Sequence, residues 1–136
     1  DFAGSALDGL VKPWTIVRRG GMKIGIIGLL TDIGKVVDVS LVSGLEYQDP
    51  AAVVNRYAEI LKKDKKCDVV ICLSHLGYTE DKVLASRIRG VDVIVGGHSH
   101  TLLHKMQHVT DLDGKDVVIV QDWCWGMSVG DLKIRK

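Results

Sequence analysis

The sequence predicts an α/β fold in which a mainly parallel sheet is followed by an antiparallel hairpin. Three apolar runs rich in β-branched residues indicate strands buried on both faces, and they span residues 22–30, 68–73 and 91–95. Helical patterns separate these runs, and this alternation favours right-handed crossovers between parallel strands. Further along, Asp113-Gly114 separates residues 106–110 from residues 117–121, which predicts the hairpin.

Local signals predict the elements before the second buried run. Residues 14–17 indicate a short strand, and the Gly20-Gly21 pair turns the chain into the first buried run. Asp49 and Pro50 suit the cap and the first turn of a helix. The run Lys62-Lys63-Asp64-Lys65-Lys66, with four lysines, closes that helix, because cations are favoured near its carboxyl end.

A second helix and a last strand complete the expected elements. Residues 80–89 carry Glu80 and Asp81 at their start, which is typical of the first turn of a helix. Residues 31–48 are expected to be irregular. Residues 129–134 alternate polar and apolar side chains, which predicts one more strand.

The composition is typical of a soluble globular domain. The 136 residues fit one domain, and 46% of them are apolar. Eighteen basic residues against 17 acidic ones give no electrostatic basis for binding a nucleic-acid polymer or an anionic membrane. No apolar run approaches the roughly 20 residues of a membrane helix. The chain begins at Asp1 rather than Met, and we interpret this start as a cut point.

The three cysteines give no indication of a disulfide framework. Cys67, Cys72 and Cys124 form no CxxC pair, and we expect them to be buried apolar side chains. Cys67 and Cys72 flank one predicted strand, which is too extended for them to bridge. The small, odd number leaves the redox compartment open.

Histidines follow two of the predicted inner strands, at the point where each strand ends. His75 comes after the run that ends at Leu73, and His98 and His100 follow the run that ends at Val95. Because the carboxyl ends of parallel strands meet at one edge of a sheet, we expect these side chains to converge. Imidazole is the commonest neutral ligand of zinc and related ions, so the trio predicts a metal site.

The spacing of His98 and His100 adds to this expectation. In an extended segment, residues two apart point to the same side, where they would bind one ion or two neighbouring ions. Gly96 and Gly97 lack side chains just before the pair, which allows close approach of backbone or ligand. Two ions about 3.5–4 Å apart also require carboxylates. Asp32 is the only candidate at a comparable strand end, and we expect it to cap a loop instead.

The histidines belong to longer stretches that carry a family resemblance. These stretches are Lys23–Leu29 (KIGIIGL), Asp68–Gly77 (DVVICLSHLG), Asp81–Ala85 (DKVLA), Gly90–Thr101 (GVDVIVGGHSHT) and, more weakly, Trp125–Leu132. In this order they resemble the calcineurin-like metallophosphoesterases, and within them the 5′-nucleotidase and 2′,3′-cyclic-nucleotide phosphodiesterase group. The pairing of SHLG with GGHSHT is specific for that group.

The resemblance implies the fold, the metals and the reaction. It implies half of a four-layer α/β/β/α sandwich, with residues 1–136 as the C-terminal half of one catalytic domain. His75 and His98 are similar to ligands of one divalent ion, and His100 is similar to a ligand of its partner. The ions would be Zn, Mn, Fe or Co. The implied reaction is release of phosphate from nucleotides by water activated at two metal ions, at an extracytoplasmic location in the periplasm or on the cell surface.

The resemblance also implies that essential parts lie outside this chain. The family's D-x-H, G-D and G-N-H-E motifs come from the N-terminal half of the domain, and none occurs here. We therefore expect little or no turnover from this chain alone. The missing half would leave one apolar face of the sheet exposed, which predicts homo-oligomers, domain swapping or aggregation.

Alternative interpretations remain. Gly25 and Gly28 suggest a dinucleotide fold, but the full G-x-G-x-x-G is absent and no helix follows promptly. The chain could serve as a non-catalytic metal- or nucleotide-binding module, or a partner chain could supply the first half. Asp81 is interpreted either as a helix-dipole partner or as an acceptor that orients a metal-bound histidine.

Two further histidines and two tryptophans also have alternative interpretations. His104 and His108 would share a face on a helix, but a strand or loop is expected there and both are interpreted as surface residues. Trp123 and Trp125, on alternate positions, suit either a base-stacking surface or the edge of a core or domain interface.

Overall fold

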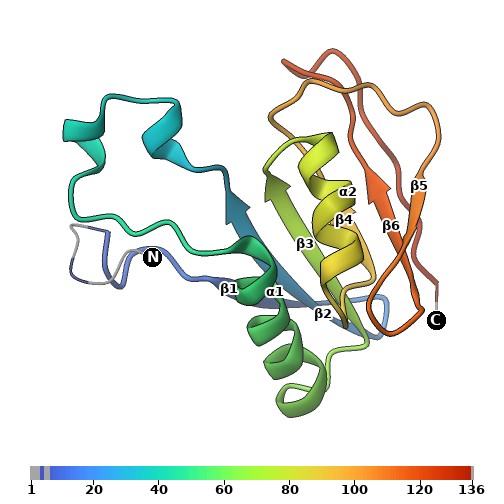
Figure 1. Ribbon diagram of the computed structural model, residues 1–136. Helices are drawn as coiled ribbons and strands as arrows, with labels where there is room; N and C mark the ends of the chain where they lie inside the picture. Colours follow the sequence, from blue (N-terminus) through green and yellow to red (C-terminus); the bar gives the residue numbers. More distant parts are fainter. Residues whose placement is uncertain (1–3, 5–6, 136) are drawn as a thin grey trace.

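A six-stranded mixed sheet forms the centre of the computed structural model, which describes residue 4 and residues 7–135 (Figure 1). The strands are β1 Trp14–Arg19, β2 Met22–Leu30, β3 Val69–His75, β4 Val93–Val95, β5 Gln107–Thr110 and β6 Asp116–Val120. Their order across the sheet is β1-β2-β3-β4-β6-β5. The four inner strands are parallel, and β1 and β5 pair antiparallel at the two edges. The predicted parallel sheet and hairpin are therefore confirmed.

Two helices cover one face of the sheet (Figure 1). Helix α1 spans Pro50–Glu59 and continues as a π-helical turn over Ile60–Asp64, and α2 spans Tyr78–Arg87. The side chain of Asp49 accepts a hydrogen bond from the backbone N–H of Ala51, which confirms the expected cap. Between β2 and α1, residues 31–48 form an irregular arm with two short 3-10 turns, Ile33–Lys35 and Val39–Val42. None of the helices that the structure describes is long and apolar enough to cross a membrane.

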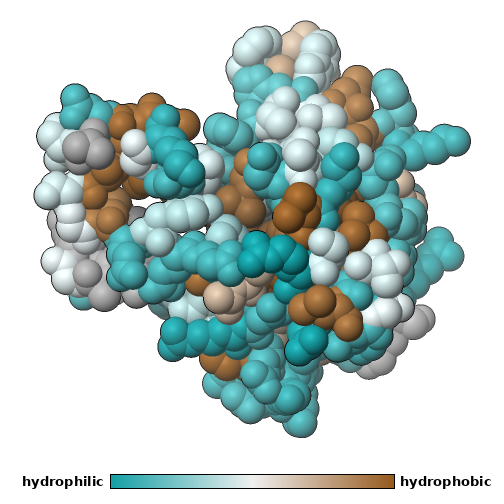
Figure 2. All heavy atoms as spheres, viewed as in Figure 1, coloured by the Kyte–Doolittle hydropathy of each residue, from teal (hydrophilic) through white to brown (hydrophobic). Residues whose placement is uncertain are grey.

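The hydrophobic core lies between the sheet and the helices. Four neighbouring side chains in register across the inner strands are fully buried: Ile27, Cys72, Ile94 and Ile119. From the helices, the core receives Val54, Leu61, Leu84 and Ile88. Since burying one such side chain contributes about 1.5–3 kcal/mol, this layer fixes the positions of the strand ends. The outer surface of the helical layer is mostly hydrophilic (Figure 2).

The opposite face of the sheet is apolar but only partly covered. Its register places Leu73 between Gly28 and Val95, with Val120 beyond, and neither α1 nor α2 belongs to this side. Leu73 is 54% exposed although it lies on a central strand. A central strand with one open apolar face differs from the expectation that the inner strands are buried on both faces.

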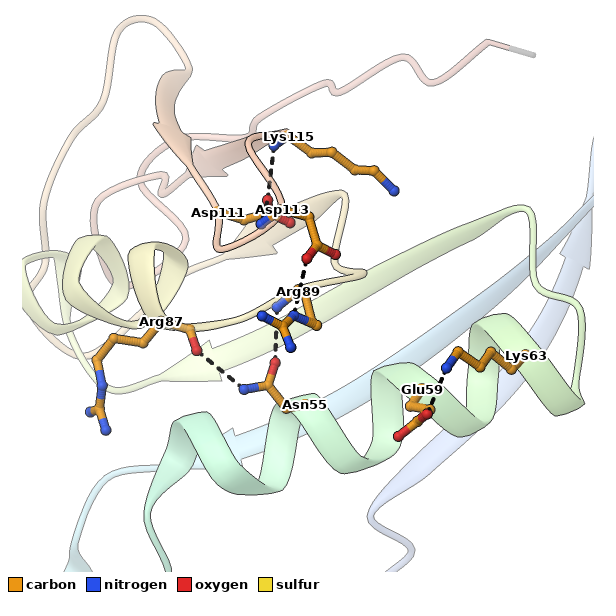
Figure 3. Close-up of polar contacts among 8 residues, drawn as sticks. All are labelled: Asn55, Glu59, Lys63, Arg87, Arg89, Asp111, Asp113 and Lys115. Atoms are coloured by element: carbon orange, nitrogen blue, oxygen red, sulfur yellow. Dashed lines mark hydrogen bonds and ion pairs between the residues drawn. The ribbon is translucent and has the colours of Figure 1, made fainter.

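Hydrogen bonds tie the helical layer together at the amino end of the sheet (Figure 3). Asn55 of α1 donates to the carbonyl of Arg87 (3.1 Å) and accepts from the backbone N–H of Arg89 (2.9 Å). Arg89 in turn pairs with Asp113, in the β5–β6 turn, at 3.2 Å. In the same turn, Asp111 accepts from the backbone of Asp113 and Lys115. These contacts join α1, the end of α2 and the hairpin.

Three expectations need correction. The strand predicted for residues 129–134 is wrong, because no backbone ladder pairs this segment with the described strands and Val129 is 92% exposed. Alternation alone does not make a strand without a hydrogen-bonding neighbour. Helix α2 is displaced two residues towards the amino end from the predicted 80–89. Cys67 and Cys72 are buried as expected, whereas Cys124 is only half-buried, and all three are free thiols.

Candidate functional site

The candidate site is the rim where β3, β4 and β6 end. Leu73, Val95 and Val120 are in register, so the residues that follow each strand emerge side by side. The rings of His75 and His98 lie edge to face with their centroids 5.2 Å apart. A Cβ on Gly97 would lie 3.1 Å from Nδ1 of His75, so the absent side chain permits this close approach. The structure thus brings two of the three predicted histidines together.

The segment that carries His98 and His100 is not extended. Both residues have left-handed backbone conformations, with φ of 70° and 51°, and the N–H of Ser99 bonds to the carbonyl of Gly97 at 2.9 Å. The expectation that the two imidazoles point to the same side is therefore wrong, because it assumed a strand-like backbone. This tight turn directs His98 towards His75.

His100 lies beside a tryptophan instead. Its ring is edge to face with Trp125, with centroids 5.5 Å apart. Trp125 is 82% exposed, and Trp123 is 41% exposed. The backbone N–H of Trp123 donates to the carbonyl of Thr101 at 3.2 Å, which pairs the tryptophan loop with the histidine loop. The two tryptophans therefore lie beside the rim rather than in the core. The interpretation that they form a base-stacking surface stays a prediction.

The rim does not form a closed metal cage. Among the described residues, no three His, Cys, Asp or Glu side chains lie close enough to hold one ion. Asp32 lines a cleft of roughly 580 Å³ that also receives His98 and Lys35. Asp32 precedes the first 3-10 turn, but its carboxylate makes no cap hydrogen bond and pairs with Lys35 at 3.4 Å instead. The expected loop-capping role of its side chain is therefore wrong.

Backbone strain is concentrated at this rim. Five non-glycine residues among those described have positive φ, and four of them are His98, His100, Trp123 and Trp125. Such conformations cost about 1–3 kcal/mol each and gather at functional sites. Sequence inspection does not reveal this signal, because even histidine, which enters the left-handed region more often than most residues, does so in only a small fraction of cases, and tryptophan has no such preference.

A buried acid lies directly behind the histidines. Asp81 is fully buried, and its Oδ1 accepts a hydrogen bond of 2.5 Å from Oγ of Ser74. Burial raises the pKa of Asp81 to about 6; the Ser74 hydrogen bond lowers it, and the charge of Glu80 raises it further. In the described structure neither oxygen of Asp81 accepts from an imidazole, so the direct histidine-orienting role is wrong.

The two remaining histidines are surface residues, as expected. His104 lies in an exposed loop. His108 lies on β5, where its Nδ1 is 2.6 Å from Oδ2 of Asp116. Neither belongs to a helix, so they do not share a helical face.

Comparison with known proteins shows what the chain is similar to. No family model matches it. It is 32% identical to a 5′-nucleotidase-related protein of Glossina morsitans morsitans over 91% of this chain and 25% of that protein. It is 31% identical to a snake venom 5′-nucleotidase of Naja atra over 96% of this chain and 27% of that protein.

A solved structure supports the same relationship. The 5′-nucleotidase precursor of Thermus thermophilus superimposes with a TM-score of 0.76 and 38% identity, over 88% of this chain and 26% of that one. The chain is therefore homologous to the 5′-nucleotidases over most of its length, which confirms the resemblance drawn from its motifs. Its fold matches part of their structures, and it spans about a quarter of the relatives it matches.

Proposed function

We propose that this chain provides part of the metal site of an enzyme that hydrolyses phosphate esters, by 5′-nucleotidase-type release of phosphate from nucleotides. The observation that supports this most directly is the His75–His98 pair, which joins two strand ends with ring centroids 5.2 Å apart. Homology to 5′-nucleotidases supports the same reaction class. We assign His75 and His98 to one ion and His100 to its neighbour.

The side chains present suit divalent transition ions. Neutral imidazole nitrogens bind Zn, Mn, Fe and Co alike, so the donors do not select one metal. When bound, two such ions supply the acidity that makes water a nucleophile near neutral pH and the positive charge that offsets the phosphoryl oxygens. The chain's own contribution is to bind and orient, through His75, His98 and the glycine that lets their rings approach.

We further propose that residues 1–136 are the C-terminal half of a catalytic domain, and that the N-terminal half supplies the carboxylate ligands. Two observations support this. The described residues contain no complete ligand cluster, and the sheet leaves Leu73 54% exposed on one side, with Val95 and Val120 beside it half-buried. A large exposed apolar patch is normally an interface. Expressed alone, the chain would cover this face by pairing with itself or by domain swapping.

The test uses the full-length protein with Mn²⁺ or Zn²⁺, assayed on a nucleoside monophosphate and on a chromogenic phosphodiester. His98→Ala is expected to lower metal affinity by more than about 100-fold, because removal of a ligand costs more than removal of an outer partner. Asn55→Ala, at the opposite end of the sheet, is the matched control and should leave the affinity unchanged. Robust hydrolysis that His98→Ala does not affect would refute the assignment.

The same full-length protein distinguishes two alternative functions, through its metal stoichiometry and its substrate preference. The first is a non-catalytic metal- or nucleotide-binding module, which the lack of a three-residue cluster among the described residues favours. Two tightly held ions per full-length protein support the enzyme, and one loosely held ion supports the module. The second is a 2′,3′-cyclic-nucleotide phosphodiesterase, for which the cyclic substrate would be hydrolysed faster than the monophosphate.

We also propose an extracytoplasmic location, in the periplasm or on the cell surface. The support is the family resemblance and the homologous nucleotidase found in snake venom. Fractionation of cells that express the full-length protein tests this proposal, and recovery in the cytosolic fraction alone would contradict it.

A further inference from the structure

The buried carboxylate of Asp81 has no role in the proposed chemistry. It lies in the first part of α2, where its backbone N–H donates to the carbonyl of Gly77 at 2.8 Å. The side chain is fully buried, and its Oδ2 has no hydrogen-bond partner among the described residues. A buried acid with an unpaired oxygen costs free energy of folding, so its presence calls for a functional explanation.

One oxygen of Asp81 holds the His75 side of the rim. Oδ1 accepts from Oγ of Ser74 at 2.5 Å, and the same Oγ accepts from the backbone N–H of Leu76 at 3.2 Å. Ser74 and Leu76 are the residues on either side of His75. The backbone that carries the His75 ring is therefore fixed on both sides through one hydroxyl, which is itself fixed by Asp81.

The other oxygen lies against the His98 side. A Cβ on Gly96 would lie 2.5 Å from Oδ2, so glycine is required for this contact. Gly96 cannot retreat freely, because its N–H donates to the carbonyl of Val120 at 2.8 Å. Beyond His98, Oγ of Ser99 accepts from the backbone N–H of Tyr78 at 3.0 Å. Helix α2 thus contacts the chain both before and after His98.

We propose that Asp81 is a positioning residue that sets the separation between the strand ends of His75 and His98, a role that rests on the proposed metal site. The position of Asp81 in the first turn of α2 suits a helix-dipole partner, but that role does not account for its contacts with both strand ends, and an acceptor for histidine would contact an imidazole. Asp81 instead contacts Ser74 and Gly96, one on each strand end. The distance between the two histidines therefore depends on the shape and hydrogen bonding of this side chain.

The experiment compares Asp81→Ala, Asp81→Asn and Ser74→Ala in the full-length protein without added metal. Amide hydrogen exchange is followed at residues 74–77 and 96–100, with residues 116–118, at the amino end of β6, as the internal reference. Asp81→Ala is expected to speed exchange at the rim about 10-fold relative to the reference, because both strand ends lose their contact. Asp81→Asn keeps the shape and one hydrogen bond and should restore most of the protection.

Ser74→Ala removes the hydrogen bond with little change in volume, so it decides the matter if Asp81→Ala does not fold. Asp64→Asn, the same change at an exposed acid beyond α1, is the control for loss of a charge. If exchange at the rim rises no more than at the reference in both Asp81→Ala and Ser74→Ala, the positioning role is overturned.

A second measurement separates this proposal from the proposed function. Titration with Co²⁺ alone, followed by its visible absorption, should show affinity lowered about 10-fold by Asp81→Ala and restored by Asp81→Asn. Cobalt affinity that is unchanged in Asp81→Ala but lost in His98→Ala would overturn the positioning role and leave the metal site standing. If His98→Ala leaves the cobalt affinity unchanged, the proposed metal site is refuted. The exchange data would still decide the role of Asp81.

Discussion

The two ends of the sheet are built on opposite principles. At the amino end, Oδ2 of Asp92 accepts from the backbone N–H of Val70 and from Lys62, both at 2.7 Å. At the carboxyl end, Asp81 has one partnered oxygen and one without a partner among the described residues. Three of the four residues with such buried, unpartnered polar atoms in the described chain are Asp81, Gln121 and Asp122, all at the carboxyl end.

The two ends of the sheet therefore contribute differently to the stability of the chain. One end satisfies polar groups with hydrogen bonds across elements, while the other carries strained backbone and a buried acid that both cost free energy. Proteins depart from local consistency mainly at functional sites. The energetic cost of the rim therefore supports the proposal that the functional site lies there, as the histidines do.

The largest expected effect compares two thiols, one under the rim and one in the rim loop. Burial, reinforced by the charge of Asp81, raises the pKa of Cys72 to about 12, and its side chain is fully buried. Cys124 is half-buried. Iodoacetamide at pH 8 should label Cys124 more than about 1,000-fold faster than Cys72, because the thiolate is the reactive form. Peptide mass spectrometry at successive times measures both rates. Equal rates would contradict the prediction, because they would show that Cys72 is as accessible to the reagent as Cys124.

The next effect concerns the buried acid. The pKa of Asp81 is raised from 3.8 to about 6 in the folded state, so its stabilising contribution is complete below pH 3.8 and lost as the pH rises through 6. Asp81→Asn should therefore raise the free energy of unfolding at pH 7 by up to about 3 kcal/mol relative to the wild type, and it should not raise it at pH 4. Urea titration at the two pH values measures the difference. Asp64→Asn serves as the control, and a gain that does not vary with pH would contradict the raised pKa.

At the opposite end, removal of a satisfied group should have the opposite sign. Asn55→Ala deletes the hydrogen bonds to Arg87 and Arg89 and should lower the free energy of unfolding by about 1–2 kcal/mol. Cobalt affinity should not change. If this variant weakens metal binding as much as Asp81→Ala does, the two ends are not separate in function.

The smallest effect compares strained residues at the two ends. Trp125 at the rim and Lys66 near the end of α1 both have positive φ, of 55° and 54°. Glycine at either position removes a cost of about 1–2 kcal/mol, partly offset by the greater freedom of the unfolded chain. Each substitution should raise the free energy of unfolding by about 0.5 kcal/mol, and only Trp125→Gly should alter the environment of His100. Denaturant titration and the NMR shifts of His100 measure the two outcomes.

The sequence was sufficient to predict the framework of the sheet. Apolar runs identified β2 and β3, although one face of these strands is only partly covered, and Asp49-Pro50 marked the start of α1 because capping is local. The meeting of His75 and His98 followed from strand ends in a parallel sheet. These signals are local or depend only on topology.

The errors involve contacts between distant segments. At the amino end of α2, the backbone N–H of Tyr78 donates to Ser99, 21 residues further along the chain, which no local signal reveals. Residues 129–134 alternate like a strand but find no neighbour in the described sheet. The turn at His98 and His100 depends on packing against His75 and Trp125, so an extended interpretation of His-x-His was wrong.

Helix α2 gives the molecule a mechanical link between its two ends. Its ten residues span about 15 Å, with Ser74 and Ser99 bound at one extremity and Asn55 bound at the other. Because the helix is rigid, a tilt at its carboxyl end, beside Asn55, also moves its amino end, beside the rim. Loss of the Asn55 contacts alone, as in Asn55→Ala, would leave the spacing of the histidines unchanged as long as α2 keeps its orientation, whereas a substitution that rotates α2 would change that spacing.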